Sequence, residues 1–219
     1  MSMVLSGLQR LLERLYDVEY RHDVADFLIT DRRTLDKFKP VNDTRDLDEQ
    51  LLLAESADGV GIGLYLDAEL LKRLERTDPV DELTDENLAD FCTALEGVSH
   101  FVYAAWRLHA DLPVSLLELE TQAEVDKYAL TVFLLGLQQG GAYPKHVHSR
   151  LFDRISFDAR LAAEQSERYR TAHECAARFC RRLERRFVNR GVARIEALTR
   201  ELRKFYRLGN REKLRYAMA

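Results

Sequence analysis

Two pairs of ionisable residues at helical spacing are the strongest candidates for chemistry in this chain. Glu96 and His100 are four residues apart, and Glu120 and Glu124 repeat that spacing further along. Residues four apart project from the same side of a helix. A short connection near residues 111–113 separates the two predicted helices, so we expect them to be antiparallel neighbours on which the four side chains could converge.

Carboxylates and an imidazole on facing helices are how helical bundles build metal sites. This ligand set suits Mn, Fe or Zn, and a metal-activated water would give a hydrolase. Alternatively, His100 could act as a general base oriented by Glu96 or Glu124, with Lys127 stabilising an anion. The sequence thus supports a metal-dependent hydrolase as one hypothesis, without fixing a catalytic residue.

The same residues also have an ordinary structural explanation. Ser115 and Glu118 have the spacing of a capping box, and acids in the first turns of a helix are stabilised by its dipole. The Glu-x-x-x-His spacing differs from the Glu-x-x-His of helical-bundle metal sites. The cluster is therefore either a site or a set of ordinary pairs, and we expect it on helix faces outside the packed apolar stripes.

Charge is divided unevenly along the chain. Residues 178–219 contain 14 Lys or Arg and 4 Asp or Glu, whereas residues 1–177 contain 19 and 33, so the net charges are +10 and −14. Such a distribution concerns partners and association rather than fold. We predict a single domain over residues 1–219, in which residues 1–177 form an acidic body with the hairpin and core helices. Residues 178–219 then form a basic helical edge.

Basic residues on the two predicted C-terminal helices lie opposite the apolar face of each helix, where they could form one positive surface. Guanidinium groups stay charged and offer paired donors that match phosphate, and Arg outnumbers Lys in residues 178–219 by 12 to 2. The predicted binding residues are Arg178, Arg181, Arg182, Arg185, Arg200, Arg203, Lys204, Arg207 and Arg211.

This surface leads to the first-choice function, a non-catalytic interaction protein that binds an anionic partner. The partner is either nucleic acid or an acidic protein surface, and binding would be sensitive to salt. The acidic body could instead accept the basic helices, within one molecule or through assembly into a homo-oligomer. This hypothesis needs no cofactor, whereas the hydrolase hypothesis needs a divalent metal such as Mn, Fe or Zn.

Most of the chain is predicted to be helical. Only 4 prolines and 10 glycines in 219 residues favour long helices. Apolar residues at helical spacing predict helices over residues 3–20, 84–107, 115–138 and 160–189, and another from residue 195. Residues 128–137 are apolar nearly all round, which places their helix at the centre of the core, and Gly140-Gly141 ends it.

One segment predicts β-structure. Residues 50–55 and 60–66 flank Asp58-Gly59, a pair that suits a hairpin turn, and the charge-dense residues 31–49 before them are predicted as an irregular connection. A lone hairpin is marginal in water, so it must gain a third strand or pack on helices. The expected fold class is α+β, mainly α-helical: a helical bundle with one β-hairpin, at about residues 50–66, packed on it.

The cysteines and hydropathy indicate a cellular location. Cys92, Cys175 and Cys180 are odd in number and lack CxxC spacing, which favours a reducing compartment. A membrane span needs ~20 consecutive apolar residues, and the longest apolar stretch, near residues 128–137, is shorter. We therefore predict a soluble cytoplasmic protein that does not enter the membrane.

Overall fold

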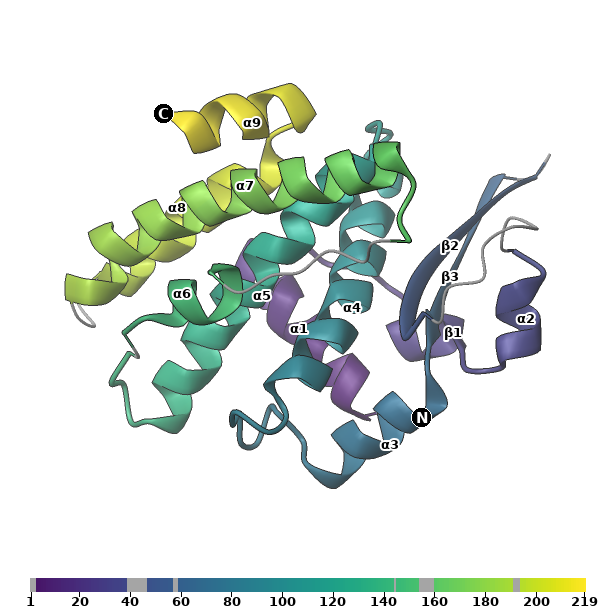
Figure 1. The fold of residues 1–219 in the computed structure, drawn as a ribbon, viewed down its shortest axis with the longest axis horizontal. Helices are drawn as coiled ribbons and strands as arrows, with labels where there is room; N and C mark the ends of the chain where they lie inside the picture. Colours follow the sequence, from purple (N-terminus) through teal and green to yellow (C-terminus); the bar gives the residue numbers. More distant parts are fainter. Residues whose placement is uncertain (1–2, 39–46, 57–58, 144, 154–159, 191–193) are drawn as a thin grey trace.

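The computed structural model describes residues 3–38, 47–56, 59–143, 145–153, 160–190 and 194–219. These form a mainly helical molecule with a small sheet on one side, which confirms the predicted α+β class (Figure 1). The helices are α1 (Met3–Tyr16), α2 (Arg32–Asp36), α3 (Ala68–Arg76), α4 (Leu88–His109), α5 (Leu116–Gln138), α6 (Val147–Phe152), α7 (Ala163–Arg186), α8 (Ile195–Arg207) and α9 (Asn210–Met218). None of the helices in the described ranges is both long and apolar enough to cross a lipid bilayer.

The predicted hairpin is present and gains a third strand. β2 (Glu49–Ser56) pairs antiparallel with β3 (Gly59–Leu66), and the short β1 (Leu28–Ile29) pairs parallel with the other edge of β3. Residues 57–58 of the predicted turn lie outside the described residues. Leu64 and Leu66 on one face of β3 join the main core, whereas Tyr65 on the other face packs with Leu35 of α2. The sheet is therefore covered on both faces, as a small hairpin requires.

Helix α5 lies at the centre of the bundle, as its apolar second half predicts (Figure 1). Ser115 and Glu118 form the predicted capping box at its start. Gly140 and Gly141 follow its end with φ of 63° and 91°, values that favour glycine. Leu137 is an exception to the predicted burial, since it is 71% exposed.

Part of the segment predicted as an irregular connection is helical. The Asp31 carboxylate accepts hydrogen bonds from the backbone of Arg33 at 3.2 Å and of Thr34 at 3.1 Å, and this cap starts α2. The last residue of the same segment, Glu49, is the first residue of β2. Residues 39–46 lie outside the described part of the chain.

A buried hydrogen-bond network fixes how α1, α4, α5 and α9 meet. The Asp126 carboxylate of α5 accepts hydrogen bonds from Tyr16 of α1, from Ser99 of α4 at 2.6 Å and from Gln122 at 2.7 Å. Lys213 of α9 is 1% exposed and donates to the Gln122 side chain at 2.6 Å. Buried polar groups cost free energy unless they are hydrogen-bonded, so each of these helices is held to the others.

Burial shifts the pKa of both ionisable groups in this network. It lowers the pKa of Lys213 to about 7, although the charge of Asp126 partly opposes the change. It raises the pKa of the Asp126 carboxyl to about 6, against the hydrogen bonds from Ser99 and Tyr16. In both residues the low-dielectric surroundings disfavour the charged form.

We expect the free energy of unfolding of the wild-type protein, relative to that of a Lys213→Met variant, to increase as the pH is raised from about 7 to 10.5. In this window the unfolded chain still holds the lysine proton and the folded chain has released it, so raising the pH favours the folded state. Urea unfolding at several pH values measures the difference.

The control is Lys72→Met, which removes an exposed lysine of α3. The stability of this variant relative to Lys213→Met should increase with pH as that of the wild type does. A wild-type minus Lys213→Met difference that stays constant over this pH range would contradict the lowered pKa.

Candidate functional site

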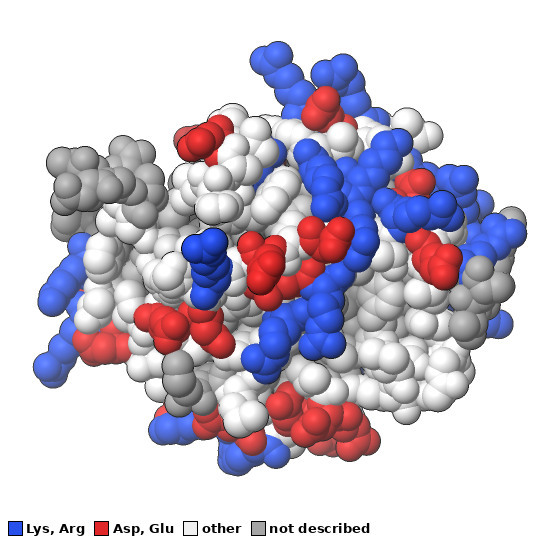
Figure 2. All heavy atoms as spheres, turned by 180° about the vertical axis from the view of Figure 1, so that it is seen from behind, with Lys and Arg blue, Asp and Glu red and all other residues white. Residues whose placement is uncertain are grey.

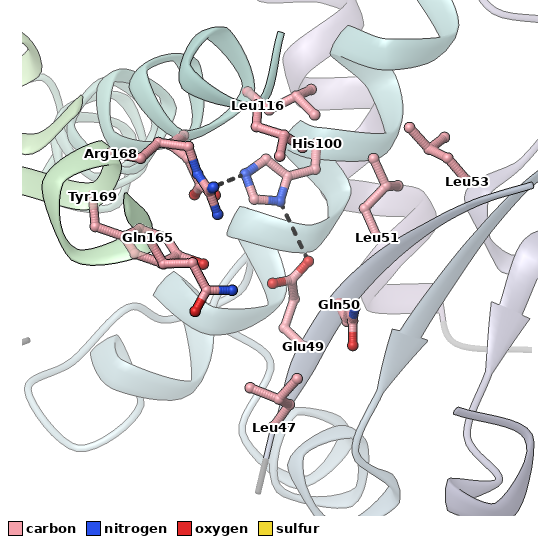
Figure 3. A pocket seen from close by; sticks show the side chains of 12 residues that line it. Leu47, Glu49, Gln50, Leu51, Leu53, His100, Leu116, Gln165, Arg168 and Tyr169 are labelled. Atoms are coloured by element: carbon pink, nitrogen blue, oxygen red, sulfur yellow. Dashed lines mark hydrogen bonds and ion pairs between the residues drawn. The ribbon is translucent and has the colours of Figure 1, made fainter. Parts of the chain in front are cut away.

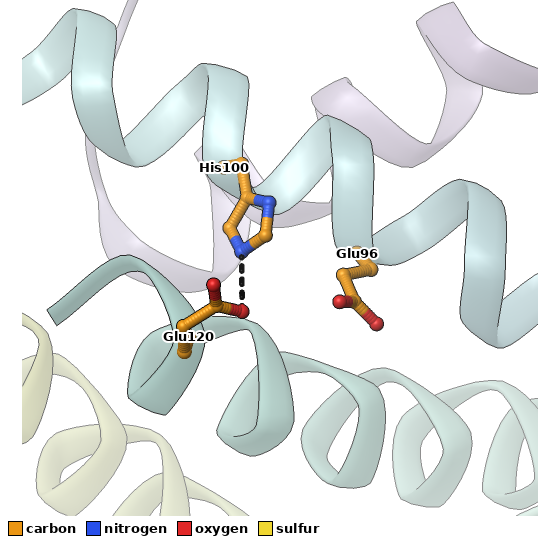
Figure 4. A group of neighbouring side chains, drawn as sticks. All are labelled: Glu96, His100 and Glu120. Carbon is orange, nitrogen blue, oxygen red and sulfur yellow. Dashed lines mark ion pairs between the residues drawn. The ribbon is translucent and has the colours of Figure 1, made fainter. Parts of the chain in front are cut away.

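His100 lies between two carboxylates from different elements. Its Nδ1 atom is 3.4 Å from Glu49 Oε1 at the start of β2 (Figure 3). Its Nε2 atom is 3.6 Å from Glu120 Oε2 on α5 (Figure 4). The imidazole is 8% exposed, and Nε2 makes no hydrogen bond with the described residues. The ring is thus held by Glu49 on one side, and on the other its buried Nε2 atom has only the longer contact with Glu120 among the described residues.

Three of the four residues predicted as metal ligands come together. Glu96, His100 and Glu120 each have one ligand atom within 4.8 Å of the others, from the neighbouring helices α4 and α5 (Figure 4). Glu124 lies outside this group; it pairs with Lys127, and its Oε2 atom is 3.7 Å from His173 Nδ1. Helical spacing and antiparallel packing therefore predicted the convergence, with one residue too many.

Two cations hold the carboxylates of the cluster. Lys127 Nζ donates to Glu96 at 3.0 Å and to Glu124, so it pairs with acids rather than facing an open anion site as predicted. Arg168 Nε of α7 lies 3.7 Å from Glu120 Oε1. A ligating carboxylate usually has such an outer partner, which fixes its orientation.

The cluster shifts the pKa of several of its groups. Burial alone would lower the pKa of His100, but contacts with Glu120 and Glu49 outweigh it and raise the pKa well above the usual value. Burial raises the pKa of Glu49, which the neighbouring His100 only partly opposes. Burial would raise the pKa of Glu124 too, but Lys127 and His173 bring it down to about 2. Opposite charges and burial thus compete throughout the cluster.

A pocket of about 270 Å³ adjoins the imidazole, with walls from β2, α4, α5 and α7 (Figure 3). His100, Glu120 and Arg168 line its polar part, whereas leucines such as Leu51 and Leu116 line the rest. Glu96 is not among its lining residues. A small molecule in this pocket would contact His100 and Glu120 directly.

The burial of this cluster differs from the sequence prediction. We expected these groups outside the packed stripes, but His100 is 7% exposed and Glu120 is 8% exposed. Strand β2 packs against α4 and brings Glu49 onto the face that carries His100. Glu49 was assigned to an irregular connection, and no role was predicted for Arg168. No spacing in the sequence marks either residue as a partner of this cluster.

The predicted basic residues fall into groups with different surroundings. Arg178, Arg181, Arg182 and Arg185 lie on α7 along a groove beside the end of α9. Arg203 and Arg207 instead donate to carbonyls near the end of α1, those of Leu15, Arg14 and Tyr16. Arg200, Lys204 and Arg211 are exposed on α8 and α9. One face of the molecule carries a band of basic side chains with acidic ones beside it (Figure 2).

Comparison with known proteins identifies no relative. No family model, curated protein or solved structure matches this chain. The geometry and chemistry of the described residues are therefore the basis for a functional proposal.

Gly97 allows the sheet to approach α4 next to His100. A Cβ atom at this position would lie 2.7 Å from Leu64 Cδ1 and 2.8 Å from Glu49 Cγ, well inside the usual carbon–carbon contact distance. Leu64 is fully buried and so has little room to move. A glycine in mid-helix costs stability, and here it allows the contact between Glu49 and His100.

We expect Gly97→Ala to lower the free energy of unfolding by about 1–2 kcal/mol, because overpacking outweighs the gain in helix propensity. The control is Gly7→Ala in α1, where the new methyl group meets only Val80 Cγ2 at 3.8 Å. That variant should be as stable as the wild type or slightly more so. Urea unfolding of both variants tests the contact, and equal stabilities would show that the sheet does not pack this closely on α4.

Proposed function

We propose that the protein is a divalent-metal-dependent hydrolase, with Glu96, His100 and Glu120 as metal ligands and the adjoining pocket as its substrate site. One observation carries the proposal. The buried Nε2 atom of His100 makes no hydrogen bond, and one ligand atom of each of Glu96, His100 and Glu120 lies within 4.8 Å of the others. Buried polar atoms are normally hydrogen-bonded, so such a nitrogen calls for a function.

The charges of the cluster also favour a bound cation. Its contacts at 3.4–3.7 Å around His100 and Glu120 are longer than hydrogen bonds between well-paired groups. Two permanent cations, Lys127 and Arg168, face the four carboxylates of Glu49, Glu96, Glu120 and Glu124. When His100 is the neutral imidazole that a metal ligand must be, a divalent ion would supply the two positive charges that these four carboxylates lack, and buried charges need such partners.

The ligand set fits a catalytic rather than a purely structural metal. Two carboxylates and one imidazole suit Mn, Fe or Zn, and three protein ligands leave a coordination position for water or substrate. Such a metal polarises a carbonyl or phosphoryl oxygen and lowers the pKa of a bound water.

The surrounding residues would support this chemistry in two ways. Glu49 faces Nδ1 of His100, so it can accept that proton and leave Nε2 free as a ligand. Arg168 adds a positive charge at the polar part of the pocket, next to Glu120, while leucines line the rest. We infer a small substrate that combines an apolar portion with a hydrolysable polar group.

We expect Glu120→Gln to weaken the binding of Mn²⁺ or Zn²⁺ by at least about 10-fold, because it replaces a charged ligand with a neutral one of the same shape. Isothermal titration calorimetry of the chelator-treated protein measures binding, and elemental analysis of the untreated protein shows which metal it carries. Hydrolysis of nitrophenyl esters and phosphate esters is then assayed with that metal.

The matched control is Glu124→Gln, one helical turn further along α5 and outside the ligand group. It should bind the metal within about 3-fold of wild type, because it removes an equal charge from a residue that is not one of the three ligands. Equal weakening in both variants would mean that the metal responds to net charge alone. A wild-type protein that binds neither Mn, Fe nor Zn would refute the proposed site.

A further inference from the structure

A second candidate site lies at the opposite end of α7, away from the metal cluster. A shallow groove of about 520 Å³ runs between the last turns of α7 and the end of α9. Five arginines line it together with the three residues at the end of α9, and no acidic side chain is among these lining residues. The arginines are Arg178, Arg181, Arg182, Arg185 and Arg186.

The spacing of these arginines concentrates positive charge on one side of a single helix. They occupy positions i, i+3, i+4, i+7 and i+8, which span ~12 Å of helix. Like charges three and four residues apart destabilise an isolated helix. This repulsion opposes the favourable interaction of Arg185 and Arg186 with the C-terminal end of the helix, and a bound anion would relieve it.

Part of the groove is already rigid. Arg182 donates to the Tyr216 carbonyl at 2.8 Å, and its guanidinium lies 5.4 Å from the Phe179 ring centre and 5.2 Å from that of Tyr216. Arg178 donates to the Met218 sulfur. Guanidinium groups held in this way lose less side-chain entropy when they bind a ligand.

The remaining arginines point to solvent. Arg185 and Arg186 are exposed and make no hydrogen bond or ion pair with other described residues, although the Arg186 guanidinium lies 5.2 Å from the Phe187 ring centre. Arg181 has only a contact of 3.6 Å with Asp153, and both of those side chains are at least half exposed. This differs from Arg203 and Arg207 on α8, whose guanidinium groups are bound to carbonyls of α1.

We propose that this groove binds the phosphate groups of a nucleic-acid backbone. Guanidinium groups match phosphate oxygens with two parallel donors, and an open groove suits an extended polyanion. Protein interfaces usually have an apolar centre, whereas the exposed large apolar side chain in this groove is Met218 alone. Because the contacts are to phosphates, binding is independent of sequence. This inference does not depend on the proposed metal.

The test is fluorescence anisotropy with a labelled single strand and a duplex of about 20 nucleotides of arbitrary sequence. We expect a dissociation constant of about 10⁻⁴–10⁻⁶ M at physiological salt, as for other non-specific binding. Four phosphate contacts would give a slope of about −3 to −4 for log K against log salt. EDTA in the buffer separates the result from that of the metal site.

The decisive variant is Arg185→Gln/Arg186→Gln, which removes the two arginines without internal hydrogen bonds or ion pairs. We expect it to weaken binding at least about 10-fold and to reduce the salt slope by about 2. The matched control is Arg200→Gln/Arg211→Gln, which removes the same charge from exposed positions outside the groove and should change affinity less than about 2-fold. Thermal melting should show both variants folded as the wild type.

Other outcomes overturn the proposal. Equal weakening in the two double variants would mean that net charge, not the groove, attracts the nucleic acid. Absence of binding to either probe at low salt would refute the site. Poly-glutamate that binds the wild type more tightly than nucleic acid, and loses affinity in Arg185→Gln/Arg186→Gln, would assign the groove to an acidic protein partner instead.

Discussion

The structure depends on one constraint, which is that the first half of α5 is polar and yet buried. Glu118, Glu120, Gln122 and Asp126 are each at most 8% exposed. At 100° per residue, Glu118, Gln122 and Asp126 share one side of the helix, whereas Glu120 and Glu124 share nearly the opposite side. Buried charges without partners are costly, so neighbours on both sides must supply them.

The two sides are satisfied in different ways. On the first, Asp126 accepts hydrogen bonds from Tyr16 and Ser99, and Gln122 accepts one at 2.6 Å from Lys213. These short contacts have the lengths of complete hydrogen bonds and tie α1, α4 and α9 to α5. On the second side, Glu120 has only longer contacts, at 3.6 Å with His100 and 3.7 Å with Arg168. The first side thus holds the fold, and the looser second side is the one on which we propose a metal ion.

Local signals in the sequence predicted much of this arrangement. The capping box at Ser115, the positive-φ glycines after α5 and the hairpin all depend on residues within a few positions of one another. The convergence of Glu96, His100 and Glu120 followed from helical spacing and a short connection. Glu49 could not be predicted, since it is 51 residues from His100 and the register of β2 against α4 brings it there. Burial of the site follows from that same packing, which no local pattern encodes.

Arginine shows the limit of local patterns most clearly. On the helical wheel, the basic residues of α7 and α8 look alike, yet Arg203 reaches the Leu15 carbonyl 188 residues away. The last carbonyls of a helix lack intrahelical partners and attract cations, so the end of α1 takes up this guanidinium.

Helix α7 uses the same residue type for opposite purposes. Arg168 faces inward to Glu120, whereas Arg185 lies some 17 residues, or ~25 Å, further along and faces solvent. That separation exceeds the screening length of ~8 Å at physiological salt, so charge at one position has little effect on binding at the other. Where α7 packs on α5, the buried Glu120 carboxylate needs a cation, and Arg168 on the inner side of α7 supplies it. The exposed Arg185 and Arg186 of its last turns make no such pair with the described residues, and the phosphate binding that we propose for them depends on this difference.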